Sequence, residues 1–313
     1  MRYRLARTFQ RCAGARSATA AVLLGVALGT LTGCGGGNPG GGGHGGSGTV
    51  SASPGSGVTG PEATGSVGAS GSSAGITWVL ERPALNALRG AGLSEAEVSA
   101  LFNNANTYVV GGFGSAHRTA TVTNLDHGSA NIPTGTTALL YDDEHWSLTP
   151  LAQQRDPGDS GAQALRLAHD EGMVLIATPA PDLADVLDPG GTGSADQRFL
   201  SLDVIASVAR NADIVDIQAQ GLEGSARYEQ FVTAAARQAR AANPKVKVLA
   251  GISTNPSGRT VSAQTFAQDA NEVRGVVDGY WLNIPSAGTA CPRCGVARPR
   301  VALPWLEALL RQS

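Results

Sequence analysis

The sequence lacks the features that mark nucleic-acid-binding proteins and proteins held on anionic membrane surfaces by charge. Only 15% of its 313 residues are charged, with 23 Lys and Arg against 25 Asp and Glu, and no run rich in Lys or Arg follows residue 76. The part after residue 76 has a net charge of −6, because the first 76 residues hold five Arg and a single acid. A mildly acidic domain without a basic run argues against nucleic acid or an anionic membrane face as its main partner.

Long hydrophobic runs are missing as well. The apolar run from Ala18 to Leu31 follows five Arg residues and is too short for a stable membrane anchor, but it fits the core of an export signal. It ends in Leu31-Thr32-Gly33-Cys34, which resembles the lipobox of bacterial lipoproteins, in which the Cys is lipidated and becomes the first mature residue. The alternative is an ordinary secretory signal that contains a Cys near its cleavage site. We expect a lipid anchor on Cys34 that holds the protein on the extracytoplasmic face of the cell membrane.

Almost nothing that could be buried follows this signal. Seventeen glycines lie between Gly35 and Gly75, with Ser, Thr and Pro among them, so a flexible tether is expected there. The chain is thereby divided into a signal peptide at 1–34, a linker at 35–76 and one folded domain at 77–313.

Cysteine is scarce, with four residues in the chain. Cys12 is lost with the signal and Cys34 is used for the lipid, which leaves Cys291 and Cys294 in a Cys-Pro-Arg-Cys segment. In an oxidising compartment the simplest expectation is a disulfide; a redox-active dithiol and a metal site are the alternatives. The histidines have no paired spacing, so we expect no metal site and no cofactor.

From residue 106 onward, short apolar runs alternate with amphipathic helical stretches. Several of the runs are apolar on both faces, as strands of a parallel sheet covered by helices are. The helical stretches place apolar residues on one stripe, and one of them starts with the capping-box pattern Ser94 to Glu97. The predicted strands are 107–110, 138–141, 173–177, 214–219, 246–252 and 280–284.

This alternation predicts an α/β fold, a (β/α) barrel of the TIM type. An open doubly wound sheet is less favoured, because no Gly-rich dinucleotide fingerprint follows the first predicted strand. Six strands are evident where a closed barrel needs eight. Ile76 to Leu80 and the region around Val301 are candidates for the other two strands, and an incomplete barrel is the alternative.

Acidic residues follow the strand at 138–141, and working groups in such folds lie at the carboxyl ends of strands. The period of two along a strand places Asp142 and Glu144 on one face and Asp143 and His145 on the other. A pair of carboxylates at a barrel mouth suits general acid/base hydrolysis. The alternative is that these acids cap the next helix or bind Arg155.

A second polar strand end is Asp213-Ile-Val-Asp216-Ile-Gln218-Ala-Gln220, the fourth predicted strand, in which the last three polar side chains share a face. Its spacing resembles the D-x-x-D-x-D-x-E motif of the chitinase-like glycoside hydrolases of family 18, which lies on the fourth barrel strand. Asp213 and Asp216 match that motif, whereas Gln218 and Gln220 replace its last Asp and its catalytic Glu. The resemblance implies a non-catalytic relative, because an amide cannot donate a proton as a general acid, and it supports a polar, sugar-compatible lumen.

The chain as a whole also resembles a family of bacterial exported lipoproteins with a TIM-like domain. We therefore predict a glycoside-hydrolase-like barrel acting on a carbohydrate or another polar small ligand, with Glu144 as the acid and Asp142 or Asp216 as its partner. A non-catalytic carbohydrate-binding lipoprotein and a structural envelope protein are the alternatives, and the sequence does not set the oligomeric state. The predicted substrate-binding residues are polar or aromatic side chains at strand ends: Gln218, Gln220, Asn255, Trp281 and Asn283.

Overall fold

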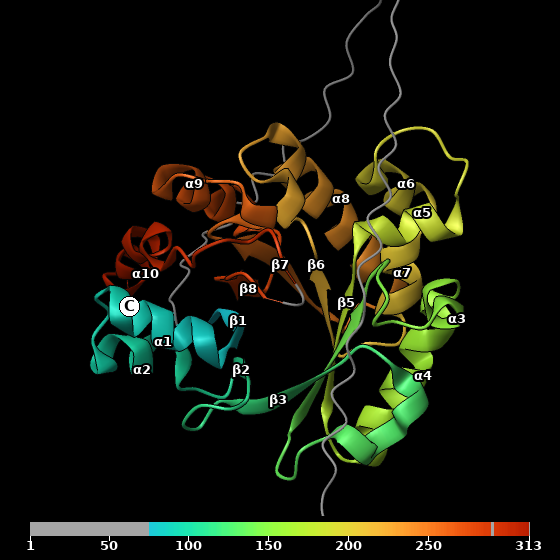
Figure 1. Ribbon diagram of the computed structural model, residues 1–313, viewed down its shortest axis with the longest axis horizontal. Coiled ribbons are helices and arrows are strands. Elements are labelled where there is room, and N and C mark those ends of the chain that lie inside the picture. Colours follow the sequence, from blue (N-terminus) through green and yellow to red (C-terminus); the bar gives the residue numbers. More distant parts are fainter. Residues whose placement is uncertain (1–74, 289–290, 313) are drawn as a thin grey trace, which may run out of the picture. The chain divides into compact units, whose positions relative to one another are not determined.

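A computed structural model describes residues 75–288 and 291–312 of the chain. The export signal, the lipidation site at Cys34 and the linker up to residue 74 lie outside these residues. The described part contains a closed barrel of eight parallel strands, in which each strand pairs with the next and β8 pairs with β1 (Figure 1). The strands are β1 (Thr77–Glu81), β2 (Thr107–Val110), β3 (His117–Val122), β4 (Ala138–Asp143), β5 (Val174–Pro179), β6 (Ile214–Ile217), β7 (Lys247–Ser253) and β8 (Gly279–Asn283).

The closed barrel confirms the predicted TIM-like fold and excludes the incomplete form. All six predicted strands are present, and the candidate at Ile76 to Leu80 forms β1. The candidate around Val301 is wrong, because Pro299–Val301 is a 3-10 turn that leads into a helix. The eighth strand is β3, which sequence analysis did not identify; it follows β2 after only six residues, without a helix between them.

The helices cover the outside of the barrel (Figure 1). Local signals begin several of them: Ser94 caps α2 in a complete capping box, Asp156 accepts a hydrogen bond from the backbone of Asp159 at the start of α4, and Ser262 does the same for Thr265 in α9. The helices are α1 (Arg82–Ala91), α2 (Glu95–Phe102), α3 (Leu151–Gln154), α4 (Pro157–Asp170), α5 (Ala184–Leu187), α6 (Ala195–Ser201), α7 (Val204–Ala209), α8 (Ala226–Ala242), α9 (Ala263–Val273) and α10 (Leu303–Leu310).

The strands carry two apolar faces that form separate cores. The larger core lies between the barrel and its helices, and an aromatic cluster in it joins Trp78 and Tyr280 of the barrel to Trp305 of α10. The smaller core fills the lumen, and its members fix which side chains of each strand point inward. These lumen residues are Val79, Tyr108, Ala138, Leu140, Ile176, Ile214, Leu249 and Trp281.

No helix in the described ranges is long and apolar enough to cross a membrane.

Candidate active site

Strand β4 delivers the acidic segment to the carboxyl end of the barrel. Leu140 belongs to the lumen core while Leu139 and Tyr141 belong to the outer core, so Asp142 points into the lumen and Asp143 points toward the helices. This is the division of faces that the sequence predicts. Both aspartates are buried, and Glu144, one residue past the strand, is half-buried.

Asp142 is held by a side chain of the neighbouring strand β5 and by a side chain that directly follows β6. The Oδ1 atom of Asp142 accepts hydrogen bonds from Thr178 Oγ1 at 2.8 Å and from Gln218 Nε2 at 3.2 Å. The same Gln218 amide also donates to the backbone carbonyl of Thr178 at 2.8 Å, and Asp142 and Thr178 are paired in the strand register. The structure therefore brings together Asp142 and Gln218, two residues that sequence analysis had placed on separate strands.

Asp142 and Glu144 ionise differently although they lie two residues apart. Burial raises the pKa of Asp142 to about 6, against the hydrogen bonds from Thr178 and Gln218, which lower it. Burial, followed by repulsion from Asp142 and Asp182, raises the pKa of Glu144 to about 8. Near pH 7 the two carboxyl groups together therefore hold about one proton.

Three further acids surround this pair, and we call the set of five the mouth acids: Glu81, Asp142, Glu144, Asp182 and Asp216. Glu81 ends β1, and burial raises its pKa. Asp182 follows β5 and accepts a hydrogen bond from the backbone N–H of His145 at 3.1 Å. Asp216 is fully buried in β6, neither of its carboxyl oxygens has a hydrogen-bond partner, and burial together with Asp142 raises its pKa.

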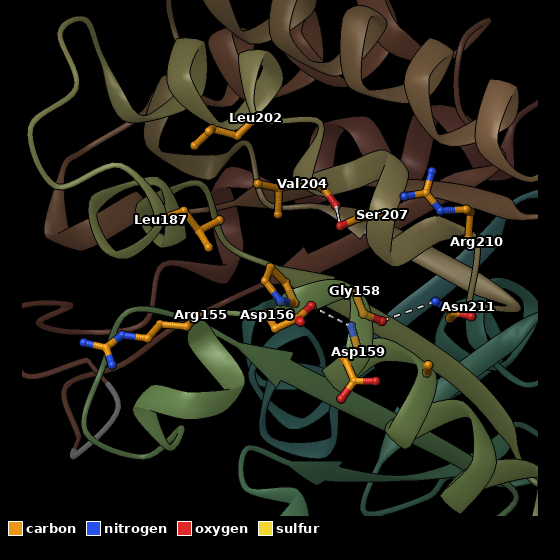
Figure 2. Close-up of a pocket in the computed structure, with 12 residues that line it drawn as sticks. Arg155, Asp156, Gly158, Asp159, Leu187, Leu202, Val204, Ser207, Arg210 and Asn211 are labelled. Atoms are coloured by element: carbon orange, nitrogen blue, oxygen red, sulfur yellow. Dashed lines mark hydrogen bonds between the residues drawn. The ribbon is translucent and has the colours of Figure 1, made fainter.

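The alternative roles for the β4 acids find no support in the geometry. The next helix, α3, begins without a side-chain cap, and α4 is capped by Asp156. Among the described residues, Arg155 forms no ion pair with Asp142 or Glu144; it lines a hollow of about 510 Å³ near the start of α4 (Figure 2).

Strand β8 places Trp281 in the lumen, as the alternation predicts. Its ring is buried and its Nε1–H has no hydrogen-bond partner, while Asn283 lies half-buried at the end of the same strand and its alternation puts it on the same face. Gln220 packs its amide against the α-carbon of Gly251, where a Cβ atom would lie 2.5 Å from Nε2. Trp281 and Asn283 thus come from one strand, and Gln220 contacts the strand beside it, because Gly251 and Trp281 are paired.

Asn255 has a structural task that sequence analysis did not anticipate. It is fully buried, and its Nδ2 donates to the carbonyl oxygens of Cys294 at 2.7 Å and Pro285 at 3.2 Å. Its Oδ1 accepts a hydrogen bond from Thr254 Oγ1. The side chain predicted to contact substrate therefore uses its hydrogen bonds to hold the segment between β8 and α10.

The same segment contains the predicted disulfide. Cys291 and Cys294 are bonded to each other, with a Cα–Cα distance of 5.4 Å. The disulfide prediction is confirmed, and in this bonded form neither sulfur is a free thiolate that could bind a metal. No group of three or more His, Cys, Asp or Glu within the described ranges is arranged to hold a metal ion.

The segment that resembles the family 18 motif lies on β6, so the predicted agreement in strand number is wrong. The miscount arises because β1 and β3 precede it in addition to the predicted strands. Asp213, one of its two matching acids, accepts hydrogen bonds from the backbone N–H of Leu175 and pairs with His169 at 2.9 Å, before β6 begins. Asp213 and Asp216 therefore lie toward different ends of the strand, and only Asp216 joins the mouth acids.

Three further acidic groups near the mouth were not predicted from the sequence. Glu81 and Asp182 were overlooked although each lies at or just after the carboxyl end of a strand, which is the signal that could have found them. Glu223 lies beyond β6, accepts a hydrogen bond from the backbone N–H of Ser253 at 2.6 Å, and has its pKa raised by burial to about 9. Its contact with β7 depends on the tertiary fold and leaves no local pattern.

No family model and no curated protein matches this chain. Among solved structures it is similar to the apo form of the homocysteine methyltransferase MmuM from Escherichia coli, at 11% identity and a TM-score of 0.32, over 68% of this chain and 73% of that one. It is also similar to phospho-2-dehydro-3-deoxyheptonate aldolase (DAHP synthase) from Thermotoga maritima, at 9% identity and a TM-score of 0.24, over 61% and 68% of the two chains. Likenesses this weak carry no argument about activity.

Proposed function

We propose that the barrel is the catalytic domain of a lipid-anchored, extracytoplasmic glycoside hydrolase. The observation that supports this most is the unequal pair at the end of β4: Asp142 and Glu144 lie at the carboxyl end of the barrel strands, and the pKa of Glu144 is raised further than that of Asp142. Two carboxyl groups with separated pKa values are what glycoside hydrolysis requires.

In this proposal Glu144 donates its proton to the glycosidic oxygen as the bond from that oxygen to the anomeric carbon breaks. Asp142, held in place by Thr178 and Gln218, either takes a proton from the attacking water or attacks the anomeric carbon itself. Carboxyl separations of about 5 to 5.5 Å give retention and about 6.5 to 9.5 Å give inversion, so the anomer of the first product, read by NMR, distinguishes the two routes. Asp216 is a poorer partner than Asp142, because full burial favours its neutral form.

Substitution of Glu144 by Gln tests the assignment of the acid. We expect Glu144→Gln to lower kcat on a natural glycan by about 10²- to 10⁴-fold, which is the usual contribution of a general acid. Turnover of an aryl glycoside with an easily displaced leaving group should survive much better, because that leaving group needs little protonation. Steady-state kinetics of the full chain on both substrates, beside the exposed Glu272→Gln control, give the answer.

A Glu144→Gln variant with full activity on the natural glycan contradicts the proposal. A chain that binds glycans without turning over any of them points instead to a tethered carbohydrate-binding protein, the alternative that the amides at Gln218 and Gln220 favour.

The membrane anchor is a separate part of the proposal and rests on the sequence around Cys34. We expect Cys34→Ser to abolish incorporation of labelled palmitate and to prevent the signal from being processed at that residue, whereas Cys12→Ser leaves both unchanged. Fractionation of cells with radiolabelled fatty acid measures this. Normal labelling of the Cys34→Ser chain contradicts the anchor.

A further inference from the structure

The mouth acids form a cluster of five carboxyl groups that no cationic side chain in the described part of the protein pairs with. None of Glu81, Asp142, Glu144, Asp182 and Asp216 takes part in the ion pairs of the described residues. The chain pairs its acids with arginine elsewhere, as in Arg198 with Asp185, Arg227 with Asp196 and Arg240 with Asp278. Among the described residues, arginine ion pairs are therefore present elsewhere in the barrel domain and absent from the mouth acids.

A second observation is independent of the charge count. Asp216 is fully buried, points into the lumen and has no hydrogen-bond partner on either oxygen among the residues that the structure describes. Continuing the β5–β6 register by one residue places it beside Thr178, which itself pairs with Asp142. A buried carboxyl group without partners is costly to the folded protein, and a donor supplied from outside would offset that cost.

The aromatic side chain in the lumen has a similar property. The Nε1–H of Trp281 is buried without a partner, and its ring belongs to the lumen core. The face of an indole ring attracts cations as well as sugar rings.

We infer that the mouth binds a cationic glycan, namely one whose sugar units carry a free, protonated amine in place of an N-acetyl group. An ammonium group has three donors, no acceptor and a positive charge. It therefore complements a group of acids without cationic partners among the described residues, one of which, Asp216, also lacks a donor there. This inference rests on the proposed function in so far as it names the substrate class of the same site.

Proton release is the signature of such binding. The groups that act on one another at the mouth are Glu81, Asp142, Glu144 and Asp182, with the fully buried Asp216 beneath them, Asp143 on the helix side of β4, and His145, which favours ionisation of Asp182. Burial and mutual repulsion keep protons on several of these acids. A bound cation favours their charged forms, so protons leave as the ligand arrives.

The test compares two probes of equal length: a glucosamine oligosaccharide and its fully N-acetylated counterpart. Isothermal calorimetry is run on the full chain carrying Glu144→Gln, so that binding is measured without turnover. We expect the amino probe to bind about 10-fold tighter or more, with affinity that falls as salt rises and a heat that depends on the buffer's ionisation enthalpy through released protons. The neutral probe should show neither dependence.

Variants of the mouth acids locate the charge. Asp216→Asn should reduce the preference for the amino probe. Because that residue is fully buried, Glu81→Gln serves as a second variant: Glu81 ends β1 and keeps solvent access although partial burial raises its pKa, so its substitution leaves the core intact and is expected to reduce the preference a few-fold. Glu272→Gln, on the outer surface of α9, should change nothing.

Equal or tighter binding of the neutral probe overturns the inference, and so does binding of neither probe. The proposed function is judged apart from it. If the unaltered chain hydrolyses a neutral glycan and Glu144→Gln does not, the proposed hydrolase function is supported and the preference for amines is not. Tight binding of the amino probe without turnover by the unaltered chain leaves a cation-selective binding protein.

Discussion

Asp143 shows how one residue can carry an unusual pKa without belonging to the site chemistry. It lies next to Asp142 but points toward the helices, and neither of its carboxyl oxygens has a partner. Burial, followed by repulsion from Asp142 and Asp182, raises its pKa to about 8. Between the ordinary pKa near 3.9 and this raised value, the unfolded chain loses a proton that the folded chain keeps, so rising pH reduces the stability of the folded state.

Asp143→Asn removes this titration. The free energy of unfolding of the variant, relative to the unaltered protein, should therefore rise from pH 5 to pH 8, by an amount of the order of 3 kcal/mol. Urea denaturation at the two pH values measures the change, and Asp170→Asn, an exposed acid at the end of α4, is the matched control. A constant offset between variant and parent at both pH values would show that Asp143 ionises normally in the folded state.

The fold changes the interpretation of Gln218 more than that of any other predicted site residue. From the sequence it is an amide where the family 18 motif has an acid. In the structure this amide donates to Asp142 and lowers the pKa of both Asp142 and Glu144. An amide at this position is thus compatible with acid chemistry at the end of β4, because it can position and tune a carboxyl pair that it does not belong to.

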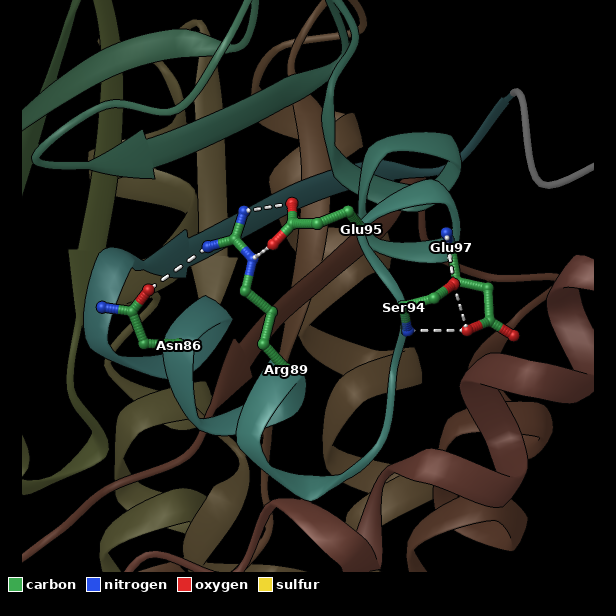
Figure 3. A network of polar contacts seen from close by, with 5 residues as sticks. All are labelled: Asn86, Arg89, Ser94, Glu95 and Glu97. Atoms are coloured by element: carbon green, nitrogen blue, oxygen red, sulfur yellow. Dashed lines mark hydrogen bonds and ion pairs between the residues drawn. The ribbon is translucent and has the colours of Figure 1, made fainter.

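At the scale of elements, α2 shows how a local signal fixes a helix start. The backbone N–H of Glu97 donates to Ser94 Oγ at 3.3 Å, and the carboxylate of Glu97 accepts from the backbone N–H of Ser94 at 2.8 Å (Figure 3). Ser94→Ala should lower the free energy of unfolding by about 1 kcal/mol, since it removes the side-chain oxygen that accepts the hydrogen bond from the backbone N–H of Glu97. Ser94→Asp keeps an acceptor there and should remain close to the parent in chemical denaturation; an equal loss in both variants would assign the effect to packing instead of capping.

The elements that the sequence predicted were those with strong local patterns. Strands such as β5 and β7 are apolar on both faces, and the helix stripes at α8 and α9 repeat every three or four residues. Strand β3 was not predicted, because its sequence, His-Arg-Thr-Ala-Thr-Val, is polar and its link to β2 contains no helix. That link turns through Gly111, Gly112 and Gly114, all with positive φ, so three glycines replace the expected crossover helix.

The site was predictable to the extent that it follows from strand ends. Asp142 and Glu144 could be found because they follow an apolar run, and their shared face follows from the period of two. The closeness of Gln218 to Asp142, and the diversion of Asn255 to the carbonyl groups of Cys294 and Pro285, depend on which strands and loops are neighbours. Such neighbours are set by barrel closure, which no local pattern encodes.

At the scale of the whole barrel, charge is distributed unequally between the two ends. The carboxyl ends of the strands carry the mouth acids, whereas a hollow of about 550 Å³ near the start of β5 and β6 is lined by Arg210, Lys245, Lys247 and His169, with Asp213 among them. A field of this direction draws cations toward the mouth and anions away from it, which favours the ligand class inferred above and weakens with salt.

The same buried acids set how the stability of the folded domain depends on pH. The folded-state pKa values of Asp142, Glu144 and Glu223 are raised to about 6, 8 and 9, and that of Asp216 is raised as well. Their contribution to stability is therefore fully present below the ordinary carboxyl pKa near 4 and is lost as pH rises through 6 to 9. Groups with lowered pKa values, such as Asp196 beside Arg227, act only at lower pH, where their contribution disappears as pH falls.

The free energy of unfolding should consequently be greatest in mildly acidic solution and fall steadily from about pH 5 to pH 9. Guanidinium denaturation at constant ionic strength across this range measures the curve, with reversibility checked at each pH. Glu223→Gln should flatten the upper part of the curve, between pH 7 and 9, because burial raises the pKa of Glu223 to about 9 and its carboxylate contacts β7, away from Asp142. A free energy that stays level or rises toward pH 9 would mean that the mouth acids are ionised in the folded protein, and the acid assigned to Glu144 would lose its proton at neutral pH.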